Sequence, residues 1–387
     1  MGNRVGDRLG YAVASAGVLL LGATPERLAL AVARGLARVV IRFDRRHAGL
    51  ARRNLDLAFG DALPDREKQR IVRESYAGLA VNAVEFVHAV RRARRGETPI
   101  ELEVEGAEHV EAVAASGRAA IFVSCHMGNW EFCPIGTARH GVPLHSIATP
   151  RRNPLLDRAL NDMRESLGQK IVWKSGAFRE AARLLRQGHS LGVLADQNQR
   201  KGSVFVEFFG ERAATTRGPA LLALRTGAPI LPGAIQRLPG TNRHRLVVTA
   251  PIEPERSGDQ GEDVARLTQR YTSRLEELIR RAPEQWLWHH RRWRTRPWKE
   301  IRTERDTRSI VRALSVGVHG HAVTLEPVVR PWEEMPSAIR TGMPQSPPLR
   351  RRASRAEASP QLREALELLR KRESPEASAP PDPSAAR

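Results

Sequence analysis

A histidine and a carboxylate five residues apart form the segment of this chain best suited to acid–base chemistry. The segment, SCHMGNWE at 124–131, closes a short apolar run at 119–124 and precedes a predicted helix. Its Gly-Asn pair permits a tight turn between the strand and the helix. We therefore expect Glu131 to contact one imidazole nitrogen of His126 while the other nitrogen faces a cleft. His126 would act as a general base and Glu131 would hold its tautomer; on spacing alone, such a pair also occurs by chance.

The elements around this segment alternate between short apolar runs and amphipathic helices. This alternation favours an α/β domain with a mostly parallel central sheet flanked by helices. The apolar runs predict strands at 119–124, 144–149, 170–174, 191–195, 229–236 and 245–250. The amphipathic segments predict helices at 64–90, 153–167, 176–187 and 262–281.

The N-terminus contains a long uncharged segment. Residues 9–25 (LGYAVASAGVLLLGATP) carry no charged side chain and follow Arg4 and Arg8. As a helix they would span about 26 Å, slightly less than a hydrocarbon core of about 30 Å. We expect a membrane-embedded or re-entrant anchor here. A cleaved signal peptide and an ordinary buried helix stay open as alternatives.

A basic amphipathic helix is predicted directly after this segment, because Thr24-Pro25-Glu26 has the residue types of a helix start. A stripe of arginines beside aliphatic residues suits an anionic membrane surface, where each arginine contributes about 1 kcal/mol. A solvated face of a globular helix is the alternative. The arginines at helical spacing are Arg27, Arg34, Arg38, Arg42 and Arg45.

The composition narrows the classes of protein and partner. The chain has 387 residues and a net charge of +20, which predicts an anionic partner: nucleic acid, an acidic membrane, an acidic protein or a phosphorylated substrate. With 41% hydrophobic residues it can bury a sizeable core, and it is not a polytopic membrane protein. Two cysteines, Cys125 and Cys133, exclude a disulfide-stapled scaffold and an all-cysteine zinc site.

Several further motifs occur in a fixed order behind the histidine segment, and together they carry a resemblance. The His-x4-Glu pattern resembles the lysophospholipid and glycerolipid acyltransferases, and the ordered set over residues 10–297 resembles the bacterial lipid A biosynthesis (late) acyltransferases. The motifs are Asn153-Pro-Leu-Leu-Asp157, Asp196-Gln-Asn198, Phe208-Phe-Gly210, Thr216-Arg-Gly-Pro-Ala220, the block 225–232 (RTGAPILP), Pro283-Glu-Gln-Trp286 and His290-Arg-Arg-Trp293.

The resemblance implies transfer of a fatty acyl group from acyl carrier protein to a hydroxyl of a phosphorylated glycolipid, a lipid A precursor in the first instance. His126 would deprotonate that hydroxyl as it attacks the thioester carbonyl. No cofactor and no metal are implied. The acidic carrier protein and the anionic inner-membrane surface both suit a basic chain. We therefore expect the protein on the cytoplasmic face of the inner membrane, and we expect no nucleic acid partner.

The resemblance also suggests substrate-binding residues. Arg164 is a candidate phosphate clamp or acyl-carbonyl contact, with an exposed helix arginine as the alternative. Asp196 follows a predicted strand and would orient Arg164 or the acceptor, or serve only to form a turn. The tryptophans around 286–298, interleaved with arginines, suit a headgroup-level belt or a stack on single-stranded nucleic acid. The remaining substrate-binding candidates are Asn129, Gln197, Thr216, Arg217 and Gly218.

One position departs from the family pattern. Family members often carry an arginine four residues before the Asn-Pro pair, where this chain has Thr149, with Arg151 and Arg152 following. Headgroup contacts are then rearranged, which leaves the acceptor open. The same chemistry on another glycolipid, such as a phosphatidylinositol mannoside, is the main alternative.

Other functions use the same residues differently. Cys-His nucleophilic catalysis is disfavoured, because Cys125 and His126 are adjacent and would point to opposite faces of a strand. A zinc site from His126, Glu131, Cys133 and His140 matches no trusted spacing. A non-enzymatic membrane or nucleic-acid binder would explain the charge but not a His-x4-Glu segment after a strand.

Three regions follow from these patterns. Residues 1–45 are expected to form the membrane-anchoring and basic helices, and residues 46–300 the acyltransferase domain. Residues 301–387 form a C-terminal extension, with a weak hairpin pattern at 313–325 and a short helix at 360–372. From about 336 the extension is rich in Pro, Ser and Arg, which predicts a largely disordered tail.

Overall fold

One seven-stranded sheet organises the fold, in the order β1-β9-β8-β2-β5-β3-β4. The structure is a computed structural model and describes residues 4–173, 177–239 and 243–297. The strands from β8 to β4 are all parallel, whereas β9 is antiparallel to β8 and carries β1 parallel to itself. The strands are β1 (Leu102–Glu105), β2 (Ile121–Ser124), β3 (Leu144–Ala148), β4 (Lys170–Trp173), β5 (Ser190–Leu194), β8 (Ile230–Arg237) and β9 (His244–Val248).

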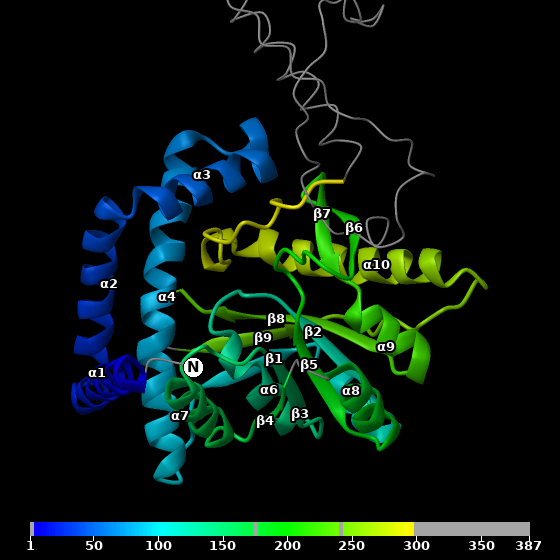
Figure 1. Cartoon of the computed structure of the whole chain (residues 1–387), viewed down its shortest axis with the longest axis horizontal. Coiled ribbons are helices and arrows are strands. Elements are labelled where there is room, and N and C mark those ends of the chain that lie inside the picture. Colours follow the sequence, from blue (N-terminus) through cyan, green and yellow to red (C-terminus); the bar gives the residue numbers. More distant parts are fainter. Residues whose placement is uncertain (1–3, 174–176, 240–242, 298–387) are drawn as a thin grey trace, which may run out of the picture. The chain divides into compact units, whose positions relative to one another are not determined.

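Helices cover both faces of this sheet (Figure 1). Alternate residues of the central strands enter opposite cores: Ile121 and Val123 of β2 pack into one, and Ala120 and Phe122 into the other. Because both faces are covered, the strands read as continuous apolar runs. The mostly parallel α/β sheet expected from the sequence is confirmed. The flanking helices are α5 (Ala107–Ala115), α6 (Cys133–Arg139), α7 (Pro154–Glu165), α8 (Ala177–Arg186), α9 (Gly218–Thr226) and α10 (Gln260–Arg281).

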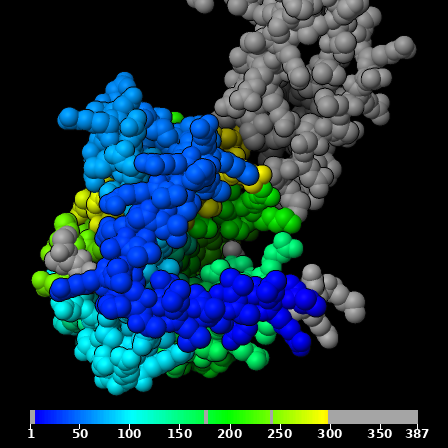
Figure 2. All heavy atoms as spheres, turned by 90° about the vertical axis from the view of Figure 1, so that its left-hand side faces the viewer, coloured from blue at the N-terminus to red at the C-terminus, as the bar shows by residue number. Residues whose placement is uncertain are grey.

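Four helices precede the sheet: α1 (Arg4–Ala23), α2 (Glu26–Phe43), α3 (Arg45–Phe59) and α4 (Asp65–Arg94). The long α4 has acidic residues in its first turn and arginines in its last, which complements the helix dipole. Ala29, Leu30 and Ala33 of α2 pack against Val81 and Val84 of α4. The first two helices lie across one face of the molecule, blue in Figure 2.

The two N-terminal segments are helices, as expected. Whether either could cross a membrane depends on its length and its apolar character. Among the described residues, no helix is both long enough and apolar enough to cross a membrane. Helix α1 runs over the uncharged segment and on through Arg4, Asp7 and Arg8.

A small hairpin lies outside the predicted pattern. It consists of β6 (Ser203–Phe208) and β7 (Glu211–Thr216), joined by Phe209 and Gly210. Both turn residues have positive φ, 56° and 76°, as in the tight two-residue turns of β-hairpins. Sequence patterning missed it because β7 is short of large apolar residues. The hairpin expected at 313–325, the helix expected at 360–372 and the expected disordered tail all lie outside the described residues.

Candidate active site

A cavity of about 650 Å³ opens beside the carboxyl ends of β2, β3 and β5. Residues at these strand ends, among them Ser124, His126 and Thr149, form part of its wall. Parallel α/β sheets place ligands at this edge, and the volume lies in the range of about 300–1,000 Å³ typical of ligand pockets. Apolar side chains such as Phe122 and Leu144 line it further back along the strands.

His126 is paired with Asp196 across two neighbouring strands. In the parallel register Ser124 of β2 lies opposite Leu194 of β5, so residues two positions further along each strand meet. Asp196 Oδ1 lies 2.7 Å from His126 Nδ1, and Asp196 Oδ2 accepts a hydrogen bond of 2.8 Å from the His126 backbone N–H. The indole Nε1 of Trp286 donates to the same Oδ2 at 2.8 Å. Asp196 is thus fixed at both oxygens.

These contacts assign the tautomer of His126. A carboxylate only accepts hydrogen bonds, so Nδ1 carries the proton and Nε2 holds a lone pair. The imidazole lines the cavity, and the Gln197 side-chain amide lies 3.3 Å from Nε2. An oriented imidazole whose Nε2 lone pair faces a cavity is the arrangement of a general base.

The electrostatics of the pair support this assignment. Burial alone would raise the pKa of Asp196, but the charge and hydrogen bonds of His126 and the Trp286 N–H lower it to about 2. Burial also acts to lower the pKa of His126, and the Asp196 carboxylate outweighs it, so this pKa is raised above its usual value. Asp196 therefore remains ionised and stabilises the protonated imidazole.

Glu131 does not hold His126, which corrects the expectation from the His-x4-Glu spacing. Its carboxylate forms a two-pronged ion pair with Arg164, with bonds of 2.9 Å from Nε and 2.6 Å from a terminal nitrogen. Gln169 donates to the Glu131 backbone carbonyl at 2.8 Å. The physical reason is that the strand register places Asp196 beside the imidazole, whereas residues 130–132 form a 3-10 turn that directs Glu131 toward α7.

Arg164, the candidate phosphate clamp or acyl-carbonyl contact, is held in place by Glu131 and Asn161. Two of its three nitrogens bond to Glu131 and the third lies 3.3 Å from Asn161 Oδ1. Burial disfavours its charge, but Glu131 raises the pKa of the guanidinium. Both side chains line the cavity. The expected link between Asp196 and Arg164 is not found, since their partners are His126 and Glu131 respectively.

The other candidates divide between the cavity wall and places away from it. Gln197, Thr216 and Gly218 line the cavity, the last two at the N-terminus of α9. Arg217 is exposed and is not part of the wall, and Asn129 is buried with its amide turned away, toward α4. Thr149 and Arg151 both line the cavity, so the position that departs from the family pattern is part of the site.

The tryptophans 286, 288 and 293 are buried, with exposed fractions of 1%, 0% and 7%, so a headgroup-level belt or a nucleic-acid stack is wrong for them. They pack against Phe208 and Phe209 of the hairpin. Trp298 lies outside the described residues. The indole rings lie in the core because burial of their large apolar area stabilises the fold. The contact of Trp286 with Asp196 was missed, although its Pro-Glu-Gln-Trp motif was visible.

Neither cysteine has the character of a nucleophile. Cys125 is fully buried and burial raises its pKa. Cys133 lines the cavity, but burial raises its pKa to about 12. A thiolate is the reactive form of cysteine, so both side chains are inert near neutral pH.

Comparison with known proteins shows the family of this chain. The sequence profile of the family described as "Bacterial lipid A biosynthesis acyltransferase" matches residues 6–295. The chain belongs to this family. A lipid A biosynthesis lauroyltransferase of Escherichia coli (strain K12) is 29% identical over 271 residues, which cover 68% of this chain and 84% of that protein.

Two further proteins similar to this chain differ in the glycolipid that their names state. A lipid A biosynthesis palmitoleoyltransferase of the same organism is 28% identical over 264 residues, covering 66% of this chain and 81% of that protein. A phosphatidylinositol mannoside acyltransferase of Mycolicibacterium smegmatis is 30% identical over 240 residues, covering 60% of this chain and 75% of that protein. Membership thus supports acyl transfer to a glycolipid.

Proposed function

We propose that the protein transfers a fatty acyl chain from acyl carrier protein to a hydroxyl of a phosphorylated glycolipid, a lipid A precursor. The observation that carries this proposal is the His126–Asp196 pair, with the Nε2 lone pair of His126 facing the cavity. Family membership supplies the class of reaction. The net charge of +20 suits both an acidic carrier protein and a phosphorylated acceptor.

The residues present can perform each proton movement of such a transfer. The acceptor hydroxyl gives its proton to His126 Nε2 as its oxygen attacks the thioester carbonyl. Asp196 stabilises the resulting imidazolium. When the tetrahedral intermediate collapses, the carbon–sulfur bond breaks and the thiolate takes that proton from His126. The products are an ester and a free carrier thiol, so protons and electrons balance.

The acyl chain would lie in the apolar part of the cavity. Phe122, Leu144 and Ile171 belong to this wall, and they come from β2, β3 and β4. Gln197 lies against Nε2, at the place where the acceptor hydroxyl must approach. An entering acceptor therefore displaces the Gln197 amide. The Glu131–Arg164 pair lies in the same wall and would contact polar parts of either substrate.

The test is an acyl-transfer assay with purified protein and His126→Ala in parallel. Mixed acyl carrier protein thioesters and coenzyme A thioesters are supplied with a lipid A precursor and, separately, with a phosphatidylinositol mannoside. We expect the wild-type protein to add one acyl mass to the lipid A precursor, and His126→Ala to lose about 10³-fold or more of this activity while remaining folded. Undiminished turnover of His126→Ala would refute the mechanism.

The two acceptors separate the two candidate functions. The mycobacterial relative, named a phosphatidylinositol mannoside acyltransferase, favours the alternative acceptor. Label in that glycolipid alone would keep the chemistry and change the pathway. Absence of His126-dependent transfer from either thioester to either lipid would favour a non-enzymatic basic binding protein.

We also propose that α1 and α2 attach the protein to the anionic cytoplasmic face of the inner membrane. Of the large hydrophobic side chains that are exposed among the described residues, all but four lie on these two helices. Leu28, Val32 and Leu36 of α2 are each more than half exposed, between arginines such as Arg27 and Arg38. An exposed apolar face with interleaved arginines suits a helix lying in an interface.

Vesicle co-sedimentation tests this attachment. Val32→Glu with Leu36→Glu should reduce binding to phosphatidylglycerol vesicles at least about tenfold, because both charge and apolar area oppose insertion. Leu79→Glu, on an exposed position of α4, is the matched control and should bind normally. Equal binding of both variants would refute attachment through α2.

A further inference from the structure

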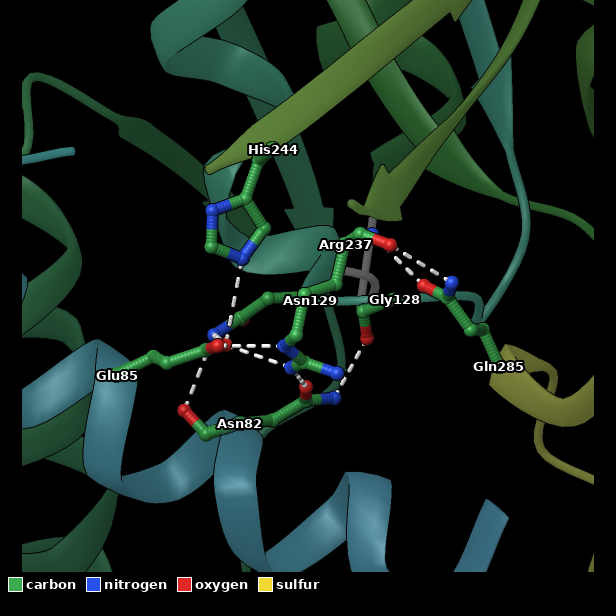
Figure 3. Close-up of polar contacts among 7 residues, drawn as sticks. All are labelled: Asn82, Glu85, Gly128, Asn129, Arg237, His244 and Gln285. Atoms are coloured by element: carbon green, nitrogen blue, oxygen red, sulfur yellow. Dashed lines mark hydrogen bonds and ion pairs between the residues drawn. The ribbon is translucent and has the colours of Figure 1, made fainter. Parts of the chain in front are cut away.

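A buried polar network connects α4 to the loop that carries His126 (Figure 3). At its centre, the side chain of Glu85 is 3% exposed. It accepts hydrogen bonds from Nε and a terminal nitrogen of Arg237, at 2.6 and 2.7 Å. Burial acts to raise the pKa of Glu85, but Arg237 and His244 lower it to about 2. The network is therefore built around an ionised carboxylate. A charged residue in the apolar stretch 81–90 of α4 is a sequence signal of this centre.

The network ends on the backbone of the catalytic loop, two residues after His126. The Asn82 side-chain amide donates to the Gly128 carbonyl at 2.6 Å, and the Gly128 N–H donates to the Gln285 carbonyl at 3.0 Å. Gly128 has φ +54°, and a Cβ there would lie 2.3 Å from the Ile235 carbonyl oxygen. The loop backbone is therefore restricted to one conformation at Gly128, where it is hydrogen-bonded through both its carbonyl and its N–H.

Arg237 determines the orientation of the Asn82 side-chain amide. One of its terminal nitrogens donates to Asn82 Oδ1 at 2.7 Å, so the Asn82 amide must present its nitrogen to Gly128. Rotation of the amide by half a turn would place its nitrogen against the Arg237 donor and its oxygen against the Gly128 carbonyl, so neither hydrogen bond could form. Glu85 fixes Arg237 and also accepts from the Asn129 amide at 3.1 Å. The same three residues thus hold positions 128 and 129 together.

We propose that Asn82, Glu85 and Arg237 are positioning residues that hold the His126 imidazole at hydrogen-bond distance from Asp196. None of the three lines the cavity, so they act through the loop rather than on substrate. Between His126 and Gly128 there is one residue, so a displacement at Gly128 reaches the imidazole directly. This inference rests on the acyl transfer proposed above, in which His126 is the base. A displacement of about 1 Å at a reacting group can cost about 10²-fold in rate.

Asn82→Asp is the most direct test, because it keeps the shape and replaces the donor toward Gly128 by an acceptor. We expect kcat to fall about 10–100-fold while KM for the acceptor changes less than about threefold. Gln269→Glu is the matched control: Gln269 of α10 holds the backbone of Glu207 through the same kind of amide, away from His126. It should leave kcat unchanged.

Titration of His126 in protein labelled with ¹³C at histidine Cε1 gives a readout independent of turnover. The His126 signal is the one that His126→Ala removes. Asp196 raises the pKa of His126, so Asn82→Asp should lower this pKa if the imidazole moves away. If Asn82→Asp does not fold, Arg237→Lys takes its place, because it keeps the charge but loses the two-pronged bond.

The outcomes separate this inference from the proposed function. Wild-type kcat and a wild-type His126 titration in the folded variant would overturn the positioning role. A fall in kcat with an unchanged titration would overturn it as well, since the loss would arise elsewhere. If the wild-type protein transfers no acyl group, the proposed function fails, and the titration alone decides whether the network holds His126.

Discussion

Two carboxylates, Glu131 and Asp196, lie at different distances from His126 along the chain, and they have different partners. Glu131 is five residues from His126 and binds Arg164 at 2.6 Å, whereas Asp196 is 70 residues away and binds His126 at 2.7 Å. The side chain of Asp196 is 2% exposed and that of Glu131 is 17% exposed. The buried carboxylate holds the His126 imidazole, and the partly exposed one pairs with an arginine in the cavity wall. Spacing within the His-x4-Glu motif therefore does not identify the partner of its histidine.

The difference follows from where each carboxylate is attached. Asp196 stands just after β5, which pairs with the strand that precedes His126, so the rigid sheet sets its distance. Glu131 stands in a 3-10 turn beyond the loop, where its side chain reaches α7. The largest functional consequence should therefore come from Asp196.

The largest effect is expected for Asp196→Asn, which keeps the shape and removes the charge. We expect kcat to fall about 10³-fold or more, because the amide neither stabilises the imidazolium nor enforces the Nδ1–H tautomer. In the proposed mechanism His126 works as a base in its neutral form, so activity should rise with pH through its raised pKa. Without the carboxylate this pKa falls, and the acid limb of the kcat/KM profile moves to lower pH. A loss of less than tenfold with an unmoved limb would contradict the pairing.

A smaller effect is expected for Glu131→Gln. The variant leaves the Arg164 guanidinium without its ion pair in the cavity wall, and we expect kcat/KM to fall about 10–100-fold through misplacement of bound groups. The acid limb should stay close to its wild-type position, because Asp196 still holds His126. Steady-state kinetics from pH 5 to 9 measure both quantities. A limb that moves as far as in Asp196→Asn would reverse the roles of the two carboxylates.

The smallest effect is expected for Trp286→Phe, which keeps an aromatic ring and removes the N–H that donates to Asp196. The free energy of unfolding should fall by about 1.5–3 kcal/mol, the range for a lost hydrogen bond to a charged group, and kcat by less than tenfold. Denaturant titration measures the first quantity. Trp288→Phe is the control, because its indole donates to the Pro283 backbone carbonyl instead. If both variants alter kcat equally, the Trp286–Asp196 bond has no role in catalysis.

Much of the fold could be predicted from the sequence. Strands β2, β3, β4, β5, β8 and β9 begin and end within two residues of the apolar runs at 119–124 through 245–250, because strands covered on both faces have unbroken apolar sequences. Strand β1 and the β6–β7 hairpin escaped prediction. Their strands carry charged residues such as Glu103 and Arg212, and β1 also depends on a pairing partner, β9, that is far away in the chain.

The sequence by itself determined that His126 follows a buried strand at a tight turn, because a run of apolar residues and a Gly-Asn pair are local signals. It also carried the motifs of the acyltransferase family. Only the tertiary structure decided which carboxylate serves His126 and that Glu85 and Arg237 support its loop. Those partners are 70, 41 and 111 residues from His126, and sheet register and helix packing bring them together. Such distances leave no periodicity in a single sequence.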